Sequence, residues 1–477
     1  SIEQKKKSRC AVHSYTTCGK HQGELMDVLI KNRERLLAHG FKAGREKAID
    51  IVTAALDGVN ARRALKRKMK IVGDVLKIED QSFDLNNYNR IYAIGSGKAT
   101  FPLAVALEDI LGDRITEGFI SVKDGQLGQL NRIRVTEAAH PVPDQRSVEA
   151  GQQILEIARK AGPDDLVFCM MSGGVSSLVC VPAAGISYTD KMTTSRMMVN
   201  SGADIDEIMT VRGQLSQIKL GRLAHLIHPA TIINLTVSDA IGDPMKWNTD
   251  WTSPDNSRPA DAVRILKKYD VWDKTPDSVK RYLLTSKPMS LGVNNQTSHR
   301  IHDFMVVKTS ELADAAVRRA RELGLEVLVL TSFLTGESRE AGRFFTAVAR
   351  EAFENKRPLH PPCALIATGE TSVRIENENC GKGGRNQEFA AGGCIDLRPS
   401  DPIVICSLGT DGTDGPTSVA GALTDGSTIV RAAKKGLDIH EQLRKHNIFT
   451  FLTSVDDAIA TGNTETNVCD IAVAVVL

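Results

Sequence analysis

The sequence predicts an α/β fold with parallel sheets, distributed over at least two domains. Short apolar runs rich in β-branched residues alternate with amphipathic helical patterns, which is typical of βαβ units. These runs are apolar at nearly every position, as expected for strands that are covered by helices on both faces of a sheet. The chain has 477 residues, which is more than one hydrophobic core usually accommodates.

The elements are predicted in chain order as follows. The segment 24–85 is charged and amphipathic, and it predicts two or more helices before the first strand. Helical patterns then recur, for example at 148–160 and 311–323, and a last apolar run covers 468–477. The predicted strands are residues 90–95, 118–122, 166–171, 230–237, 303–307, 327–331, 364–368 and 403–408.

The domain boundaries follow changes in composition. Residues 1–23 are polar and predict a flexible leader. A polar stretch after Pro288 predicts a boundary that separates a larger domain, 24–296, from a C-terminal domain, 297–477. The last strand could return to the first domain.

Composition limits the class of partner. Lys and Arg total 60 against 58 for Asp and Glu, so no overall charge draws the protein to nucleic acid or to an anionic membrane. The nine cysteines are scattered and several lie in apolar runs, which is typical of buried thiols in a reducing compartment. No apolar run reaches the ~20 residues of a membrane span, and we therefore expect a cytoplasmic protein. The oligomeric state is left open, with a homodimer as one option.

Polar, glycine-rich loops follow several strands, where parallel α/β folds place their functional groups. The first loop is Gly95-Ser96-Gly97-Lys98-Ala99, in which small residues would let backbone N–H groups approach an anion beside the Lys98 ammonium. A tight turn with a solvated lysine is an equally good interpretation of this loop alone. It is neither a Walker A loop nor a dinucleotide fingerprint.

A second anion cradle is predicted after the strand 166–171, from Ser172, Gly173, Gly174 and Ser176. Asp239 and Asp243 follow the strand 230–237 and would suit Mg²⁺, although either one alone could simply cap a helix.

The second half of the chain has a denser pattern of the same kind. Residues 381–388 read GKGGRNQE, and the glycines around a Lys and an Arg predict a flexible cationic loop for an oligoanion. The loop 409–416, GTDGTDGP, begins its acidic positions with Asp411 and does not have the spacing of a calcium-binding EF-hand.

Taken together and in order, these motifs resemble the glycerate 2-kinase family, whose C-terminal part is the MOFRL module. The resemblance extends from about residue 25 to the end. It is carried by GSGKA (95–99), HPVPD (140–144), SGGVSSL (172–178), SDAIGDP (238–244), TGET (368–371), GKGGRNQE (381–388), GTDGTDGP (409–416) and TGNTETNVCD (461–470).

The resemblance implies two Rossmann-like domains with an interdomain active site, and transfer of the ATP γ-phosphoryl group to the 2-hydroxyl of D-glycerate. On this basis Lys98 and Arg385 match the two basic residues central to catalysis, Asp239 is a further catalytic candidate, and Mg²⁺ would lie near Asp239, Asp243 or Asp411. The expected ligands of ATP and substrate are Gly95, Ser96, Gly97, Ser172, Gly173, Gly174, Ser176, Gly383, Gly384, Asn386 and Glu370.

The sequence departs from the family pattern at residues 245–252, which read MKWNTDWT where a stretch like IASGPT is usual. Two tryptophans in a loop beside the cleft could change the acceptor. The alternatives are therefore a kinase or binding protein of the same fold for another hydroxy acid, and an NAD(P)H-dependent hydroxypyruvate reductase. The missing GxGxxG motif argues against the reductase.

Overall fold

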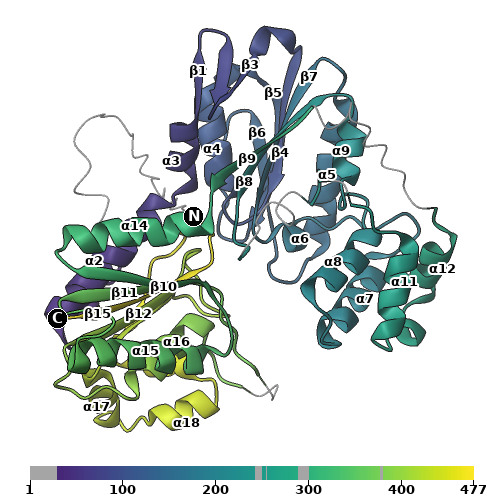
Figure 1. Cartoon of the computed structure of the whole chain (residues 1–477). Coiled ribbons are helices and arrows are strands. Elements are labelled where there is room, and N and C mark those ends of the chain that lie inside the picture. The colour runs from purple at the N-terminus through teal and green to yellow at the C-terminus, as the bar shows by residue number, and fades with distance from the viewer. Residues whose placement is uncertain (1–28, 242–249, 254, 288–299, 376–379) are drawn as a thin grey trace, which may run out of the picture.

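The computed structural model describes residues 29–241, 250–253, 255–287, 300–375 and 380–477. The predicted leader, Asp243 and most of the unusual loop 245–252 lie outside these residues. Figure 1 shows one lobe around each of two large sheets and a group of helices beside the first lobe. The α/β fold class is confirmed.

The first sheet has six parallel strands in the order β6-β5-β4-β7-β8-β9. This is the doubly wound order, in which the connections change direction between β4 and β7 and leave a crevice at the carboxyl ends of those strands. The loops 95–99 and 172–177 begin at that crevice, as the sequence predicted. The strands are β4 (Arg90–Ser96), β5 (Ile115–Lys123), β6 (Ile133–Ala138), β7 (Asp165–Ser172), β8 (Thr231–Val237) and β9 (Ile301–Val307), and two of the connecting helices are α4 (Thr100–Leu111) and α5 (Gln145–Lys160).

The second sheet also has six strands, in the order β10-β11-β15-β12-β13-β14, but it is mixed rather than mainly parallel. Among its described strands only β10 and β11 pair in parallel, because β15 inserts antiparallel between β11 and β12, and the loop 410–420 returns β13 antiparallel to β12. The strands are β10 (Glu326–Leu334), β11 (Cys363–Gly369), β12 (Ile403–Gly409), β13 (Gly421–Asp425), β14 (Ala458–Ile459) and β15 (Asp470–Val476). Helices α15 (Ser338–Asn355) and α16 (Arg385–Cys394) contact this sheet, as do α2 (Lys42–Gly58) and α14 (Thr309–Glu322).

The division between the two sheets differs from the predicted boundary at 296/297. Strand β9 follows that boundary but pairs with β8 of the first sheet, and the N-terminal helix α2 packs on β12 and β15 of the second. Strand β15 stays in the second sheet, so the last strand does not return to the first. Helix α2 is held against the second lobe by a buried ion pair, in which Arg45 contacts Asp425 at 2.5 Å and Asp457 at 2.8 Å.

All eight predicted strands are present, but the sequence missed others. The segment 69–84, predicted as helical, forms a small antiparallel sheet of β1 (Met69–Val72), β2 (Val75–Ile78) and β3 (Gln81–Asp84). The prediction of two or more helices in 24–85 is confirmed by α1 (Arg33–Leu37), α2 and α3 (Ala61–Lys68).

A group of helices with its own apolar core lies beside the first lobe (Figure 1). Met198, Val211, Leu266 and Val279 are buried in this core. The group consists of α7 (Tyr188–Asn200), α8 (Ile205–Gln214), α11 (Pro259–Lys268) and α12 (Asp277–Thr285). The other α-helices of the described ranges are α6 (Val175–Leu178), α9 (Arg222–Ile227), α17 (Ser427–Ala433), α18 (Ile439–Arg444) and α19 (Ile448–Ser454). Among the described residues, no helix combines the length and hydrophobicity that a membrane crossing would need.

Candidate functional site

The first two predicted loops pack directly against each other. The backbone N–H of Lys98 donates to the Gly173 carbonyl at 3.0 Å, and that of Ala99 donates to Ser172 Oγ at 2.9 Å. Gly97 has a φ of +136°, and a Cβ there would collide with Ser172. Gly97 therefore allows β4 and β7 to approach each other closely. The backbone N–H groups of Lys98 and Ala99 already donate hydrogen bonds within the protein. Gly95 likewise abuts Met170.

The Lys98 side chain reaches across to the second lobe. Its Nζ lies 2.7 Å from Asp411 Oδ2, in the loop after β12, and the side chains are 17% and 10% exposed. Asp411 Oδ1 accepts two further hydrogen bonds from Thr413, from the backbone N–H and from Oγ1, both at 3.0 Å. Burial alone would raise the pKa of Asp411, but Lys98, Thr413 and Lys123 outweigh it and lower that pKa. Asp411 is thus held as a carboxylate between the lobes.

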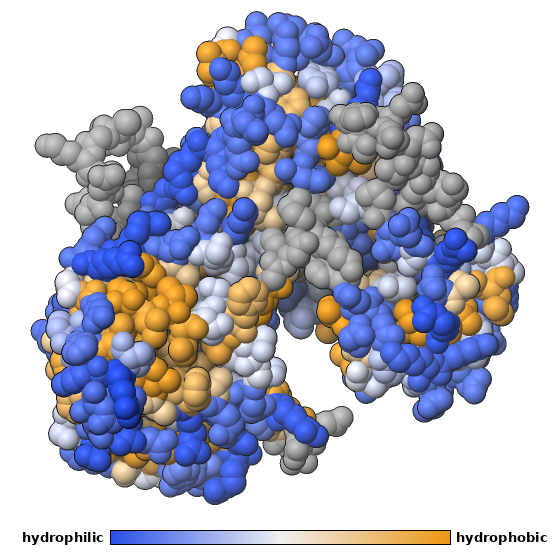
Figure 2. All heavy atoms as spheres, viewed as in Figure 1, coloured by the Kyte–Doolittle hydropathy of each residue, from blue (hydrophilic) through white to orange (hydrophobic). Residues whose placement is uncertain are grey.

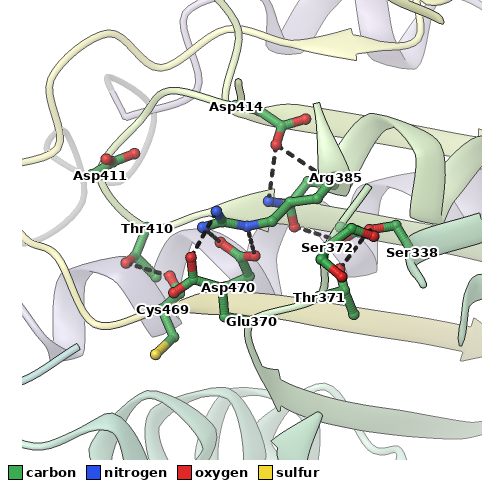
Figure 3. A network of polar contacts seen from close by, with 12 residues as sticks. Ser338, Glu370, Thr371, Ser372, Arg385, Thr410, Asp411, Asp414, Cys469 and Asp470 are labelled. Carbon is green, nitrogen blue, oxygen red and sulfur yellow. Dashed lines mark hydrogen bonds and ion pairs between the residues drawn. The ribbon is translucent and has the colours of Figure 1, made fainter. Parts of the chain in front are cut away.

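Arg385 begins α16 and is surrounded by acids (Figure 3). It contacts Asp470 through two nitrogens, at 2.5 Å and 3.0 Å, and Glu370 at 2.8 Å. Burial by the surrounding protein raises the pKa of Glu370, although its side chain is 45% exposed. The charges of Arg385 and Lys98 both act to lower that pKa. The two predicted cations therefore act on the same carboxylate, although they come from different lobes.

Asp239 lies at the carboxyl end of β8 and is held from the second lobe. Asn467 Nδ2 donates to its Oδ2 at 2.9 Å, and the Cys469 thiol donates to its backbone carbonyl at 2.6 Å. Burial raises the pKa of Asp239, while Lys98 and Asn467 act to lower it.

Asp239 also borders a cavity of about 160 Å³. All four residues of the second predicted cradle line this first cavity. It is lined by Met171, Ser172, Gly173, Gly174, Val175, Ser176, Met209, Lys219, Asp239, Ala240, Asp250 and Trp251.

In the loop 381–388, Arg385 contacts Glu370 and Asp470, and the Asn386 side chain also bonds Asp470. Gly384 abuts Asp414, and Gly383 abuts Ile448, so these glycines allow close packing of the loop. Asn386 is buried and bonds Asp414 and Ser407, which leaves its side chain unavailable to a ligand. Asp414 caps α16 by accepting backbone N–H bonds from two residues of its first turn, and burial raises its pKa to about 6.

Several residues of the cluster were missed by sequence reasoning. Asn467 and Asp470 belong to the quoted motif TGNTETNVCD, but only the fold brings them to Asp239 and Arg385. His140, in HPVPD, lies next to Gly174, where an added Cβ would contact it. Burial is the main cause that lowers the pKa of His140 to about 4, and the charges of Lys98 and Lys123 act in the same direction. The imidazole is therefore neutral at physiological pH.

The unusual loop 245–252 enters the described structure only at its end. Trp251 is 0% exposed and packs in the core beside β7, while it also lines the first cavity. Asp250 forms an ion pair with Lys219. The sequence predicted that the tryptophans of this loop border the cleft. Trp251 forms part of the wall of the first cavity, and Trp247 lies outside the described residues.

Comparisons with known proteins agree with this architecture. The family model described as "Domain of unknown function (DUF4147)" matches residues 47–284, and the MOFRL family model matches residues 363–470. The chain is 35% identical to a glycerate 2-kinase of Pyrococcus horikoshii, over 91% of this chain and 97% of that protein. A putative hydroxypyruvate reductase of Agrobacterium vitis is 37% identical over 80% of this chain and 98% of its own.

A solved structure gives the same result in three dimensions. The crystal structure of a glycerate kinase from Thermotoga maritima superposes with a TM-score of 0.77 at 33% identity, covering 91% of this chain and 99% of that one.

Proposed function

Because the chain belongs to the glycerate kinase family, we propose that it uses Mg-ATP to phosphorylate the 2-hydroxyl group of D-glycerate. Family membership makes it a kinase that transfers phosphate to an alcohol. The donor, the metal and the position of the acceptor hydroxyl are our proposal. The reductase alternative is not favoured, since the loop after β4 contains no dinucleotide fingerprint.

One observation carries the proposal most directly: two cations from different lobes meet the same acidic cluster. Lys98 contacts Asp411, Arg385 contacts Glu370 and Asp470, and both cations act on Glu370. Phosphoryl transfer depends mainly on positioning and on neutralising charge at the transferring group. Two cations from different lobes would neutralise the charge of an acceptor carboxylate and of a transferring phosphoryl group.

In the proposed reaction the bond between the γ-phosphorus and the β-bridging oxygen breaks, and a new bond forms to O2 of glycerate. The hydroxyl proton passes to the Asp239 carboxylate, and ADP leaves. Asp239 suits this role because burial raises its pKa, so that it binds a proton more readily than a solvated aspartate. Arg385 would bind the glycerate carboxylate, and Lys98 would stabilise the transferring phosphoryl group.

The donor set of the cluster is compatible with Mg²⁺, which accepts one or two protein carboxylates together with phosphate oxygens. Among Asp239, Glu370, Asp411 and Asp470, Asp411 is the acid whose pKa is lowered, and Asp239 lies within its electrostatic reach. No group of three potential metal ligands exists among the described residues, so phosphate oxygens or water would complete the coordination. When bound, the metal would neutralise charge on the phosphates.

The proposal is tested with purified protein, Mg-ATP and D-glycerate, with the phosphorylated position identified by ³¹P NMR. Lys98→Ala and Arg385→Ala should each lower kcat/KM by at least about 100-fold, as expected for loss of a transition-state charge contact. Lys382→Ala is a matched control, since Lys382 is exposed on the same glycine loop and should retain wild-type turnover. Wild-type turnover in both alanine variants, or a product phosphorylated at the 3-position, would refute the assignment.

Two further variants separate the roles of the acids. Asp411→Asn should raise the Mg²⁺ concentration needed for half-maximal activity, whereas Asp239→Asn should lower kcat with little change in that requirement. The opposite pattern would exchange the two roles. A panel of larger hydroxy acids in the same assay tests the acceptor, because the wall formed by Trp251 could favour one of them.

A further inference from the structure

A second cavity, of about 210 Å³, adjoins the first one and lies largely between the loop 172–177 and the helix group. It shares Ser176 and Lys219 with the first cavity. The rest of its lining comes mainly from α7, with contributions from α8 and from residues 141–143. Figure 1 shows α6, α7 and α8 close together, and Figure 2 shows an open hollow between the helix group and the second lobe.

Three cations in this second cavity have no carboxylate partner. Among the residues that the structure describes, no acid lies within ion-pair distance of Lys191, Arg196 or Arg212. Lys191 is only 6% exposed, and its Nζ has a single weak contact, the Val181 carbonyl at 3.4 Å.

The other two cations differ in exposure and in their neutral contacts. Within the described part of the chain, the Arg212 side chain donates to a neutral acceptor, Ser195 Oγ, at 2.6 Å. Arg196 is exposed at the cavity.

Such an arrangement is costly unless an anion completes it, because a buried charge without a counter-charge loses its hydration. Burial is the main cause that lowers the pKa of Lys191 to about 8. The one carboxylate that acts on Lys191 is Asp250, which is already paired with Lys219. A bound anion would supply the missing counter-charge.

The remaining lining indicates what kind of anion fits. Val142 and Val199 are 56% and 51% exposed, and Met192 lies beside them in the lining. Exposed valines at the edge of this mainly apolar cavity offer contact to a flat apolar group such as a nucleobase, whereas a small hydroxy acid has no surface of that kind.

The acidic cluster around Lys98 does not provide the same conditions. There the carboxylates outnumber the cations, so a triphosphate would find too little positive charge without the metal. The cations are Lys98, Lys123 and Arg385, and the acids are Asp239, Glu370, Asp411 and Asp470.

We propose that the second cavity binds the nucleotide. Its α- and β-phosphates would contact Lys191, Arg196 and Arg212, and its base would lie on Val142 and Val199. The γ-phosphate would then extend past Ser176 toward Lys98. Lys98 lies close to this loop, because a Cβ placed on Gly174 would be 3.3 Å from Lys98 Cγ. This assignment rests on the proposed kinase function and adds to it the location of the donor.

The test compares Arg196→Gln and Lys191→Met with the wild type, using calorimetric titration with ADP and steady-state kinetics with Mg-ATP and D-glycerate. Each variant should raise the Kd for ADP and the KM for ATP by about tenfold or more, the usual effect of losing one charge-assisted hydrogen bond. The KM for glycerate should change less than twofold. Arg264→Gln on α11 is the matched control, because Arg264 is 72% exposed and lies outside the cavity lining.

The outcomes separate this inference from the kinase function itself. Unchanged ADP affinity in both variants, with an active wild-type enzyme, would overturn the nucleotide site and leave the kinase proposal intact. An increased KM for glycerate alone would overturn it too, by assigning the cavity to the acceptor. Failure of the wild-type protein to bind ADP or to turn over would defeat both. Since Arg196 is exposed, its variant should fold normally, which a thermal unfolding measurement can verify.

Discussion

Replacing Gly173 with Ala should disable the enzyme while leaving the fold largely intact. A Cβ on Gly173 would lie 1.6 Å from Asp239 Oδ2 and 2.2 Å from Asn467 Nδ2. Side-chain carbon atoms essentially never come within 3.0 Å of such neighbours, so the carboxylate or the loop must move by about 1.4 Å. Both obstructing atoms belong to one hydrogen bond of 2.9 Å, and relieving the overlap would break it.

The magnitude follows from that displacement. A shift of about 1 Å in a catalytic group commonly costs about 100-fold in rate, so kcat for Gly173→Ala should fall by about two orders of magnitude. Overpacking a dense site should also lower the free energy of unfolding, by about 1–3 kcal/mol. Gly173 does not have a positive φ, so backbone strain adds nothing to this loss.

The assay is turnover with Mg-ATP and D-glycerate, combined with circular dichroism and thermal unfolding to show that the variant is folded. Gly162→Ala serves as the control, because a Cβ there would meet its nearest neighbour, Asp165 Oδ2, at an ordinary 3.5 Å. A folded Gly173→Ala protein with kcat within about threefold of the wild type would refute the view that Asp239 must remain in place.

Three other predictions concern the metal and the buried ion pair. Chelation of Mg²⁺ with EDTA should abolish turnover reversibly without changing the circular dichroism spectrum; residual activity would argue against a metal requirement. Arg45→Met should lower the free energy of unfolding in urea by about 3–5 kcal/mol, because it removes the counter-charge of Arg45 from the buried Asp425, while Asp457 keeps only its ion pair with Arg431 among the described cations at bonding distance; a loss below about 1 kcal/mol would contradict this account. Burial alone would raise the pKa of Asp425, but Arg45 outweighs it and lowers that pKa to about 2. Its contribution to stability should therefore be present above the usual pKa of 3.8 and be lost as the pH falls toward 2, and this pH dependence should be absent from Arg45→Met.

A feature of this fold could be predicted from the sequence when the residues that determine it are close together in the chain. Strand β6, which reads IRVTEA, was missed, but the other five strands of the first sheet were predictable because a short apolar run carries its own signal. The antiparallel position of β15 was not, since a strand's partners are chosen by the whole sheet and its local pattern is the same in either direction. For the same reason the packing of α2 on the second sheet could not be read from residues 42–58, whose partner Asp425 is 380 positions away from Arg45.

The site shows the same contrast. Sequence alone determined the family, the two cations Lys98 and Arg385, and the loops that carry them, because these are contiguous motifs at strand ends. Only the tertiary structure decided that Asp411 pairs with Lys98, that Asp470 holds Arg385, and that Gly383 and Gly384 pack closely against Ile448 and Asp414. Charge pairing and burial arise between segments that are distant in the chain. They exist only once two lobes have folded against each other, and no spacing within a motif records them.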